Sequence, residues 1–363
     1  MGAAVPQDAD AFVVSVIVPA YRSVATLGRC LHAIRASELP GVAWELIVVD
    51  DRSDDGTRDL AGRMADRLVQ IADGPRGPAH ARNAGAAVAG GDILVFVDAD
   101  VVLATDALRR MVAHLIAGSG TSAVFGTYDD KPDDPGFVSQ YRNLLHHRVH
   151  ITSAGAASTF WGACGAVRRA DFDAVGQFDD RRYPRPQIED VELGYRLSDA
   201  GHRIVLDPAI RCTHLKRWTL RGMLRVDLVD RAIPWMHLLV ARRETVARGP
   251  LNLRRSEKWL TAITGLSLLM LFVSVLLRDM RVLLASAAGL AIVVAANVPL
   301  LSWFASVRSP WFALRVVPLR VLFYMECAIA AAFVILSSAT GAASSGAHRG
   351  SSVHDRHQTE PIA

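Results

Sequence analysis

Residues 93–100 read ILVFVDAD, an apolar run that ends in two carboxylates one residue apart. The run from Ile93 to Val97 has the length and aliphatic composition of a strand buried on both faces, which is typical of parallel sheets. Ligands of such sheets bind at the carboxyl ends of the strands. Asp98 and Asp100 are therefore the first candidates for a binding site.

Two earlier apolar runs predict the same kind of sheet. Ser15–Pro19, within VVSVIVPAY, and Leu46–Val49 are rich in β-branched residues, and Ala25–Ser37 between them places apolar residues on one helical face. Strands that alternate with helices at this spacing predict an α/β fold with a mostly parallel, Rossmann-like sheet covered on both faces.

The same alternation continues after a loop-rich middle stretch. A helix is expected from Glu189 to a C-terminal glycine at Gly201. A strand is expected at Arg203–Leu206, and the breakers Asp207 and Pro208 should end it.

An acidic turn follows the second predicted strand. Its sequence, DDRSDDGT at residues 50–57, places Asp51 where a carboxylate can accept from a uracil imide or a ribose hydroxyl. The alternative is a turn whose carboxylates only cap the next helix. An EF-hand loop is disfavoured because no bidentate glutamate follows at the required distance.

The carboxylates of Asp98 and Asp100 favour a divalent cation. They can meet one Mg²⁺ or Mn²⁺ and leave coordination sites open for a diphosphate, whose charge on departure the cation would neutralise. A D-x-D tripeptide alone is a weak signal. Its weight comes from the apolar strand before it and from Asp51 at the end of another strand.

Two later clusters carry further candidates. QIED at residues 187–190 begins a predicted helix, so Glu189 and Asp190 either cap that helix or supply a general base for an acceptor hydroxyl. HLKRW at residues 214–218 holds a histidine that can ligate the metal and an arginine, Arg217, that can hold a diphosphate oxygen. A lone histidine is more often structural, so both interpretations of His214 stay open.

The composition argues against several other classes of protein. The chain has 363 residues and a net charge of +4, without the basic runs that track nucleic acid, and we expect no nucleic-acid partner. It has no G-x-x-x-x-G-K-[ST] sequence and no G-x-G-x-x-G after the first strand, which disfavours a P-loop ATPase and a dinucleotide dehydrogenase. Its four cysteines are scattered, and we expect them to be reduced.

Five motifs, taken together and in their order, resemble those of family 2 glycosyltransferases with the GT-A fold, over residues 14–218. They are VIVPAY, VVDDRSDDGT, GPAHARNAGAAVAGGDILVFVDADV, WGACGAVRRADFDAVGQFDD and IEDVELGYRLSDAG. One departure is Arg52, which stands where the family usually has glycine.

This resemblance implies a role for each motif. The residues implied for the nucleotide-sugar donor are Pro19, Tyr21, Asp51, Arg82, Asp98, Arg217 and Trp218. The residues implied for Mg²⁺ or Mn²⁺ are Asp98, Asp100 and His214. Asp190, with Glu189 beside it, would be the catalytic base of an inverting displacement, and Gly162 and Gly165 would lie on the acceptor side.

The last third of the chain has the composition of membrane-spanning helices, and the mean hydropathy of the whole chain is +0.23. Trp259–Leu277, Val282–Leu301 and Val321–Ala342 are three successive apolar runs that are long enough to cross the hydrocarbon core. Before them, Thr219–Arg242 is amphipathic and predicts surface-lying helices, which Pro234 should interrupt.

We therefore predict a GT-A catalytic domain at 1–218, interfacial helices at 219–257, three transmembrane helices at 258–342 and a disordered polar tail at 343–363. Arginines cluster before the first and third apolar runs. By the positive-inside rule they predict a multi-pass protein of the cell (inner or plasma) membrane whose catalytic domain is cytoplasmic.

The predicted function is an inverting, metal-dependent transfer of sugar from a nucleotide sugar to an acceptor hydroxyl. The resemblance favours UDP, with GDP and dTDP as alternatives. A lipid or lipid-linked acceptor fits the membrane spans, and membrane lipids are then partners; a growing exopolysaccharide is the alternative. Membrane polysaccharide synthases and ceramide glucosyltransferases of the family carry Q-x-x-R-W, with glutamine where this chain has His214. The missing glutamine disfavours a processive, chain-building enzyme.

Two readings from other classes remain. A phosphatase of the haloacid-dehalogenase type is one, because VFVDADVV fits its nucleophile strand, although several strands precede it here. The other is an inactive membrane scaffold that binds sugar nucleotides, which would usually have lost a motif carboxylate.

Overall fold

The computed structural model describes residues 13–116, 120–242 and 255–347. Most of the arginine-rich segment before the first apolar run, and the predicted tail from residue 348 onward, lie outside these residues.

Two compact units make up the chain. The first comprises Met1–Val226 and Thr245–Glu257, and the second comprises Asp227–Glu244 and Lys258–Ala363. The predicted catalytic domain therefore falls within the first unit, and the three predicted spans fall within the second.

A nine-stranded sheet forms the centre of the first unit, in the order β3-β2-β1-β4-β8-β6-β9-β5 with β7 beside β9. Its first half is parallel, since β1 pairs with β2 and β4, and β2 pairs with β3. In the second half β8 is antiparallel to both of its neighbours, so the sheet is more mixed than the sequence indicates. The strands are β1 Val13–Ala20, β2 Ala43–Asp50, β3 Arg67–Gln70, β4 Ile93–Val97, β5 Val101–Leu103, β6 Thr121–Tyr128, β7 Gly155–Ala157, β8 Cys164–Arg168 and β9 Arg203–His214.

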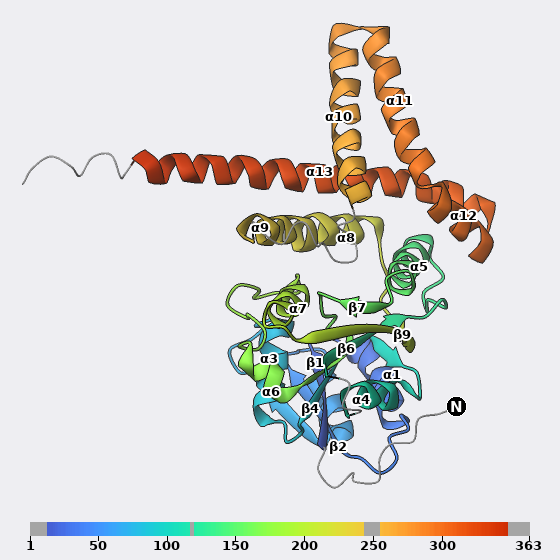
Figure 1. The fold of residues 1–363 in the computed structure, drawn as a ribbon. Coiled ribbons are helices and arrows are strands. Elements are labelled where there is room, and N and C mark those ends of the chain that lie inside the picture. The colour runs from blue at the N-terminus through green and yellow to red at the C-terminus, as the bar shows by residue number, and fades with distance from the viewer. Residues whose placement is uncertain (1–12, 117–119, 243–254, 348–363) are drawn as a thin grey trace, which may run out of the picture. The chain divides into compact units, whose positions relative to one another are not determined.

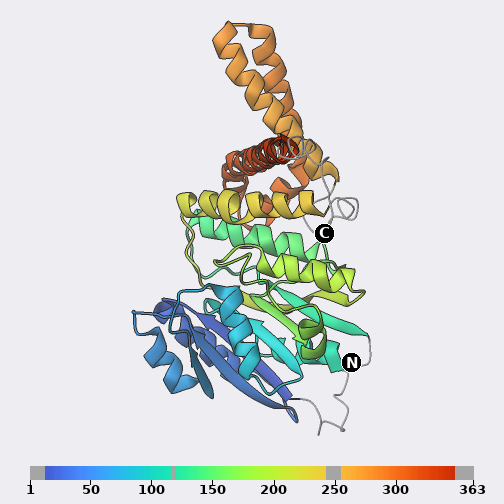
Figure 2. The same cartoon turned by 90° about the vertical axis from the view of Figure 1, so that its left-hand side faces the viewer.

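Helices cover both faces of this sheet, as predicted, and Figure 1 shows α1 and α4 on the opposite side from α3 and α6. Residues Leu31 of α1 and Met111 of α4 belong to one buried apolar cluster, whereas Phe172 of α6 and Leu193 of α7 belong to another. Figure 2 turns the same layers by 90°. The helices of this unit are α1 Val24–Arg35, α2 Thr57–Met64, α3 Pro78–Val88, α4 Ala107–Ile116, α5 Phe137–Ile151, α6 Arg169–Ala174, α7 Glu189–Asp199 and α8 Leu220–Arg225.

The register of the first strands brings the acidic motifs to one edge of the sheet. Ala20 at the end of β1 pairs with Asp50 of β2, and Ile17 pairs with Phe96 of β4. All residues of β4 are buried, which confirms that this run is a strand enclosed on both faces. The carboxyl ends of β2 and β4 therefore deliver Asp51 and Asp98 to the same side.

Strand β9 is longer than predicted. Asp207 and Pro208 do not end it, and it continues to His214. Its pairing with β6 jumps from Phe125–Leu206 to Thr127–Arg211, so the two breakers fall in an irregularity where no ladder hydrogen bond is required of proline. This continuation carries His214 toward the edge where Asp98 lies.

The second unit is helical throughout its described residues. Pro234 does not interrupt the helical stretch after α8. The π-helical segment η2 precedes it, and the proline is the second residue of α9. The elements are η2 Val226–Ala232, α9 Ile233–Ala241, α10 Arg255–Leu277, α11 Met280–Ala296, α12 Val298–Val307 and α13 Pro310–Ala347.

Among the described residues, two helices are long and apolar enough to cross a membrane by themselves, Ser256–Leu277 and Pro310–Ser337. A third span is possible only if α11 and α12, which bend by 52° at their junction, act as one. The predicted run Val282–Leu301 crosses that bend. Length and composition therefore allow two or three spans.

A buried polar network lies at the bend between α11 and α12. Asn297 donates to Val293 O and accepts from Arg320 Nε at 2.9 Å. Arg320 also donates to the Tyr324 hydroxyl at 2.6 Å. Two features account for the bend. The proline at the start of α12 has no backbone N–H to donate, and the Asn297 side chain bonds the carbonyl of Val293.

Candidate active site

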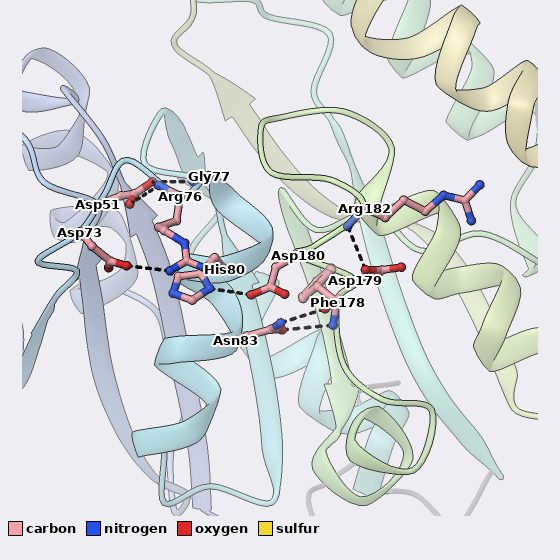
Figure 3. A network of polar contacts seen from close by, with 10 residues as sticks. All are labelled: Asp51, Asp73, Arg76, Gly77, His80, Asn83, Phe178, Asp179, Asp180 and Arg182. Atoms are coloured by element: carbon pink, nitrogen blue, oxygen red, sulfur yellow. Dashed lines mark hydrogen bonds and ion pairs between the residues drawn. The ribbon is translucent and has the colours of Figure 1, made fainter.

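Asp51, in the acidic turn after β2, has a buried side chain. Its oxygens accept from Arg76 N at 2.8 Å and from Gly77 N at 2.7 Å (Figure 3). Gly77 has φ +87°, and a Cβ there would lie 2.6 Å from Pro184 O, so only glycine fits. Asp51 thus holds the loop at residues 73–77, and its predicted contact with a nucleotide base stays a prediction.

The backbone at Arg52 has a conformation that suits glycine. Its φ is +64°, in the left-handed region, where an L side chain is strained. Its guanidinium Nη1 donates to Gly74 O at 3.0 Å, which ties the turn to the loop that Asp51 holds.

Two other donor candidates lie at the carboxyl end of β1. Pro19 pairs with Val49 within the sheet, and Tyr21, just beyond the strand, is exposed with Arg22 over its ring at 5.3 Å. They flank the edge to which Asp51 belongs.

Arg82 joins the metal motif to the helix of the predicted base. It lies on α3, is 3% exposed, and donates to Asp98 Oδ1 at 2.7 Å and to Glu189 Oε1 at 2.9 Å. Burial alone would lower the pKa of its guanidinium, but the carboxylates of Asp98, Glu189 and Asp190 raise it instead. Arg82 is therefore a fixed cation between three carboxylates.

Asp100 and His214 form the second pair at this edge. The antiparallel pairing of β5 with β9 sets Val101 beside His214, and His214 Nε2 lies 3.4 Å from Asp100 Oδ2. Burial works to raise the pKa of Asp100, but the contact with His214 and the nearby charge of Lys216 lower it. A carboxylate oxygen and an imidazole nitrogen thus face each other.

Asp98 does not complete a three-residue metal cluster with this pair. Within residues 13–116, 120–242 and 255–347, no group of three or more His, Cys, Asp or Glu side chains is arranged to hold a metal ion. Asp98 Oδ1 accepts from Arg82 Nη2 at 2.7 Å instead. Burial raises the pKa of Asp98, as do the neighbouring carboxylates of Asp100 and Glu189, against the effect of Arg82.

Asp190 lies at the start of α7, as predicted, and is only half-buried. Its Oδ2 accepts from Gly162 N at 3.1 Å, and its Oδ1 accepts from Val191 N at 2.8 Å. Desolvation, followed by the adjacent charge of Glu189, raises the pKa of Asp190 to about 6. A carboxyl group with this pKa is suited to general base chemistry near neutral pH.

Glu189 is more fully engaged than its neighbour. It is buried, and its two oxygens accept from Arg82 Nη1 and from Gln187 N, both at 2.9 Å. This geometry fits a residue that positions Arg82. It fits less well a residue that takes a proton from a substrate.

The two glycines predicted on the acceptor side occupy different settings. Gly162 donates to Asp190, and a Cβ there would lie 3.1 Å from the guanidinium carbon of Arg82, so it belongs to the group described above. Gly165 pairs with Phe96 and Phe125 inside the sheet, where a Cβ would lie 2.5 Å from Trp161 O. Its position gives it a packing role.

The HLKRW motif is split between exposed and buried residues. The Arg217 side chain is 83% exposed and lies 3.7 Å from Asp134 Oδ2, so it is free to reach a ligand. Trp218 is buried, with Lys216 Nζ 4.4 Å from its ring centroid.

Sequence reasoning missed the contribution of α5. Asn143 accepts from His214 Nδ1 at 2.8 Å, and Ser139 Oγ accepts from Trp218 N at 2.8 Å. Tyr128, at the end of β6, stacks on the His214 ring at 4.6 Å with an interplanar angle of 8°. These contacts join residues about 70 to 90 positions apart, and no local motif marks them.

The loop after α6 was also not identified as part of this edge. His80 Nδ1 lies 2.5 Å from Asp180 Oδ2, and Asn83 exchanges two hydrogen bonds with the backbone of Phe178 (Figure 3). Asp179 Oδ1 accepts from Arg182 N and closes the loop on itself. The loop is thereby fastened to α3, the helix that carries Arg82.

Comparisons with known proteins agree with this arrangement. Residues 15–176 match the family described as Glycosyl transferase family 2. The chain is 35% identical over 232 residues to Glycosyltransferase AglE from Haloferax volcanii, a match that covers 60% of this chain and 75% of that protein. It is 28% identical over 248 residues to Succinoglycan biosynthesis protein ExoA from Rhizobium meliloti, covering 62% of this chain and 73% of that protein.

A solved structure shares the fold. Mannosyltransferase PcManGT from Pyrobaculum calidifontis, determined in complex with GDP-Man and Mn²⁺, is similar with a TM-score of 0.54 and 24% identity, over 88% of this chain and 86% of that chain. The predicted GT-A fold is confirmed by this likeness together with the family match.

Proposed function

From the premise that this chain belongs to glycosyl transferase family 2 and uses a nucleotide-sugar donor, we propose that it is an inverting, metal-dependent enzyme acting on a membrane-borne acceptor. One observation carries the proposal. Asp100 and His214, as ligands of a cation, face each other, and Arg82 bonds Asp98, two residues before Asp100, and Glu189, which adjoins the candidate base Asp190.

Asp100 and His214 would hold the cation, and the donor diphosphate would supply further oxygen ligands. Mg²⁺ and Mn²⁺ commonly bind through one or two protein ligands plus phosphate oxygens, so two side chains suffice. When bound, the cation stabilises the negative charge on the departing nucleoside diphosphate. Mn²⁺ accompanies GDP-Man in the mannosyltransferase named above, and here the proposal stands on this chain's own residues.

The donor lies along the edge formed by β1, β2 and β4. Asp51 and the backbone that it orders receive the nucleoside, and Arg217, exposed and cationic, receives a diphosphate oxygen. UDP is the proposed nucleotide, with GDP and dTDP as alternatives.

Asp190 takes the proton of the acceptor hydroxyl as that oxygen attacks the anomeric carbon and the nucleoside diphosphate leaves. The hydrogen bond from Gly162 N fixes its orientation, and the pKa of about 6 keeps it ionised at neutral pH. A single base without a second nucleophile favours one displacement, and therefore inversion. Arg82 and Glu189 position these groups and do not react.

The acceptor is a lipid or lipid-linked hydroxyl at the cytoplasmic face of the cell membrane. Helices long and apolar enough to cross a bilayer follow the catalytic unit directly in the chain, and the arginines before the apolar runs favour a cytoplasmic catalytic domain. The alternative is a growing exopolysaccharide, and similarity to a succinoglycan biosynthesis protein favours it.

Release of nucleoside diphosphate from a panel of UDP-, GDP- and dTDP-sugars tests the donor and the metal together. We expect one nucleotide class to react in Mn²⁺ or Mg²⁺ and EDTA to abolish the reaction reversibly. Asp100→Asn should abolish it permanently, whereas Asp106→Asn, which alters a surface pair with Arg110, should not. Full activity in chelator would contradict metal dependence.

A second assay tests the acceptor. The full-length protein is given the reactive donor with either extracted membrane lipids or water-soluble oligosaccharides. Transfer of label to the lipid fraction supports the proposal, and transfer only to soluble glycans would replace it with the polysaccharide alternative.

A further inference from the structure

Helix α5 is fastened to the motif that carries His214 at three points. Asn143 bonds the His214 ring, Ser139 bonds the backbone of Trp218, and the Arg142 guanidinium lies over the Trp218 ring at 5.4 Å. These residues occupy one stretch of the helix, so α5 sets the position of the C-terminal end of β9 and of the segment that follows it.

The contact with His214 determines which ring nitrogen faces the site. The amide oxygen of Asn143 has no hydrogen, so His214 Nδ1 must carry the proton and donate. Nε2 is then the nitrogen that faces Asp100 Oδ2, 3.4 Å away. A histidine ligates a metal through the nitrogen opposite the one that its hydrogen bond protonates.

The ring is fixed in two ways. Tyr128 stacks on it almost in parallel and sets its plane. Asn143 sets its rotation within that plane, because a ring turned over would place a carbon against the amide oxygen. His214 is 6% exposed and Asn143 is 1% exposed, so water does not replace this contact.

The setting of Asn143 is unfavourable for stability by itself. Its amide nitrogen Nδ2 is buried without a hydrogen-bond partner among the described residues. An unsatisfied buried donor is destabilising, and an apolar residue of the same shape would avoid it. Within the part of the chain that the structure describes, the Asn143 side chain bonds only His214, and this observation assigns it a function.

We propose that Asn143 is a positioning residue for the metal: it fixes the tautomer and orientation of His214 so that Nε2 and Asp100 can hold a divalent cation together. This inference rests on the metal site of the proposed function. Asn143 touches neither the donor nor the reacting atoms, and it acts only through His214.

The experiment measures binding of Mn²⁺ to full-length protein in detergent, first alone and then with UDP or GDP, by the electron paramagnetic resonance signal of free Mn²⁺. Asn143→Leu removes the acceptor, and we expect about 10- to 100-fold weaker binding. Asn143→Asp retains an oxygen for Nδ1–H, and its affinity should stay within a few-fold of the parent. The melting temperature is measured as well, because Asn143→Leu removes one unsatisfied amide but leaves His214 Nδ1–H without its acceptor.

A double-mutant cycle separates positioning from general damage. In a His214→Ala background, Asn143→Leu should cause no further loss of Mn²⁺ affinity, because the residue through which it acts is gone. An equal loss in both backgrounds would overturn the proposal. Asn83→Leu, which breaks the two bonds to Phe178, is the matched control and should lower the melting temperature while leaving Mn²⁺ affinity unchanged.

The outcomes distinguish this inference from the function on which it rests. Parent protein that binds Mn²⁺, together with an Asn143→Leu variant that binds it equally well, overturns the inference and leaves the metal site intact. Parent protein that binds no Mn²⁺ with either nucleotide overturns both.

Discussion

The two halves of the catalytic unit are built differently. In the half formed by β1, β2 and β4 with α3, each predicted residue follows the strand or lies in the helix that its own sequence predicts, and Asp51 and Arg76 are only 25 positions apart. In the half formed by α5, α7, β8 and β9, the contacts are remote, such as Asn143 with His214, 71 positions apart. The first half is organised by local sequence and the second by packing.

The donor site and the acceptor site therefore depend on different kinds of contact. The turn after β2 is held by the loop at residues 73–77, which follows it by about 25 positions in the chain. A base or a metal ligand held by a distant helix keeps its geometry only while the whole unit is folded. Variants that cross between the halves should therefore have larger effects than variants within the first half.

The largest effect is expected at Asp190, where the second half supplies the base. Asp190→Asn should reduce kcat by roughly two to four orders of magnitude, the usual contribution of a general base. Donor affinity should stay unchanged because the residue faces the acceptor. Steady-state kinetics with donor binding measured separately checks this. Asp173→Asn, the same change at an exposed carboxylate, is the control, and lost donor affinity with retained kcat would reject the assignment.

Arg82 tests the link between the halves, because it joins Asp98 of the first to Glu189 of the second. Arg82→Met leaves two carboxylates facing each other without a cation, and we expect the free energy of unfolding to fall by about 3–5 kcal/mol. The control is Arg76→Met, which breaks an exposed pair with Asp73 and should cost less than about 1 kcal/mol. Equal losses in chemical denaturation would mean that the link is not structural.

The pH profile tests the electrostatic setting of Asp190. Because its pKa is raised to about 6 and the ionised form is the base, kcat/KM should be constant above pH 6 and fall about tenfold per unit below it. A limb governed by an ordinary aspartate would appear near pH 4 instead. Asp190→Asn should abolish this limb in whatever activity remains, and its persistence would assign the limb to another group.

The smallest effect is expected at Arg52, inside the turn that follows β2. Arg52→Ala and Arg52→Gly both lose the bond to Gly74, but only glycine relieves the strain of φ +64°. The glycine variant should be more stable than the alanine variant by about 1 kcal/mol. Identical melting temperatures for the two variants would show that the turn relaxes to another conformation.

The predicted membrane helices differ from the observed helices at one point. The apolar runs predicted helices, and helices are present, but the second run is bent by 52° at its end and qualifies as a span only together with α12. Hydropathy reports composition along the chain and is insensitive to a bend. Asn297 lies at that bend and is bonded to Arg320 across 23 positions.

The sequence by itself determined the α/β class, the buried strand before Asp98, the helix that begins at Glu189 and the family to which the chain belongs. These follow from local periodicity and from motifs whose residues are adjacent, and such signals survive without any knowledge of packing. Only the tertiary structure decided that Asp98 faces Arg82, that Asp100 is left to pair with His214, and that β9 continues through Asp207 and Pro208. The physical reason is that a side chain's partner is chosen by burial and charge in three dimensions, where an orphaned carboxylate or imidazole is costly, and residues far apart in the chain satisfy one another there.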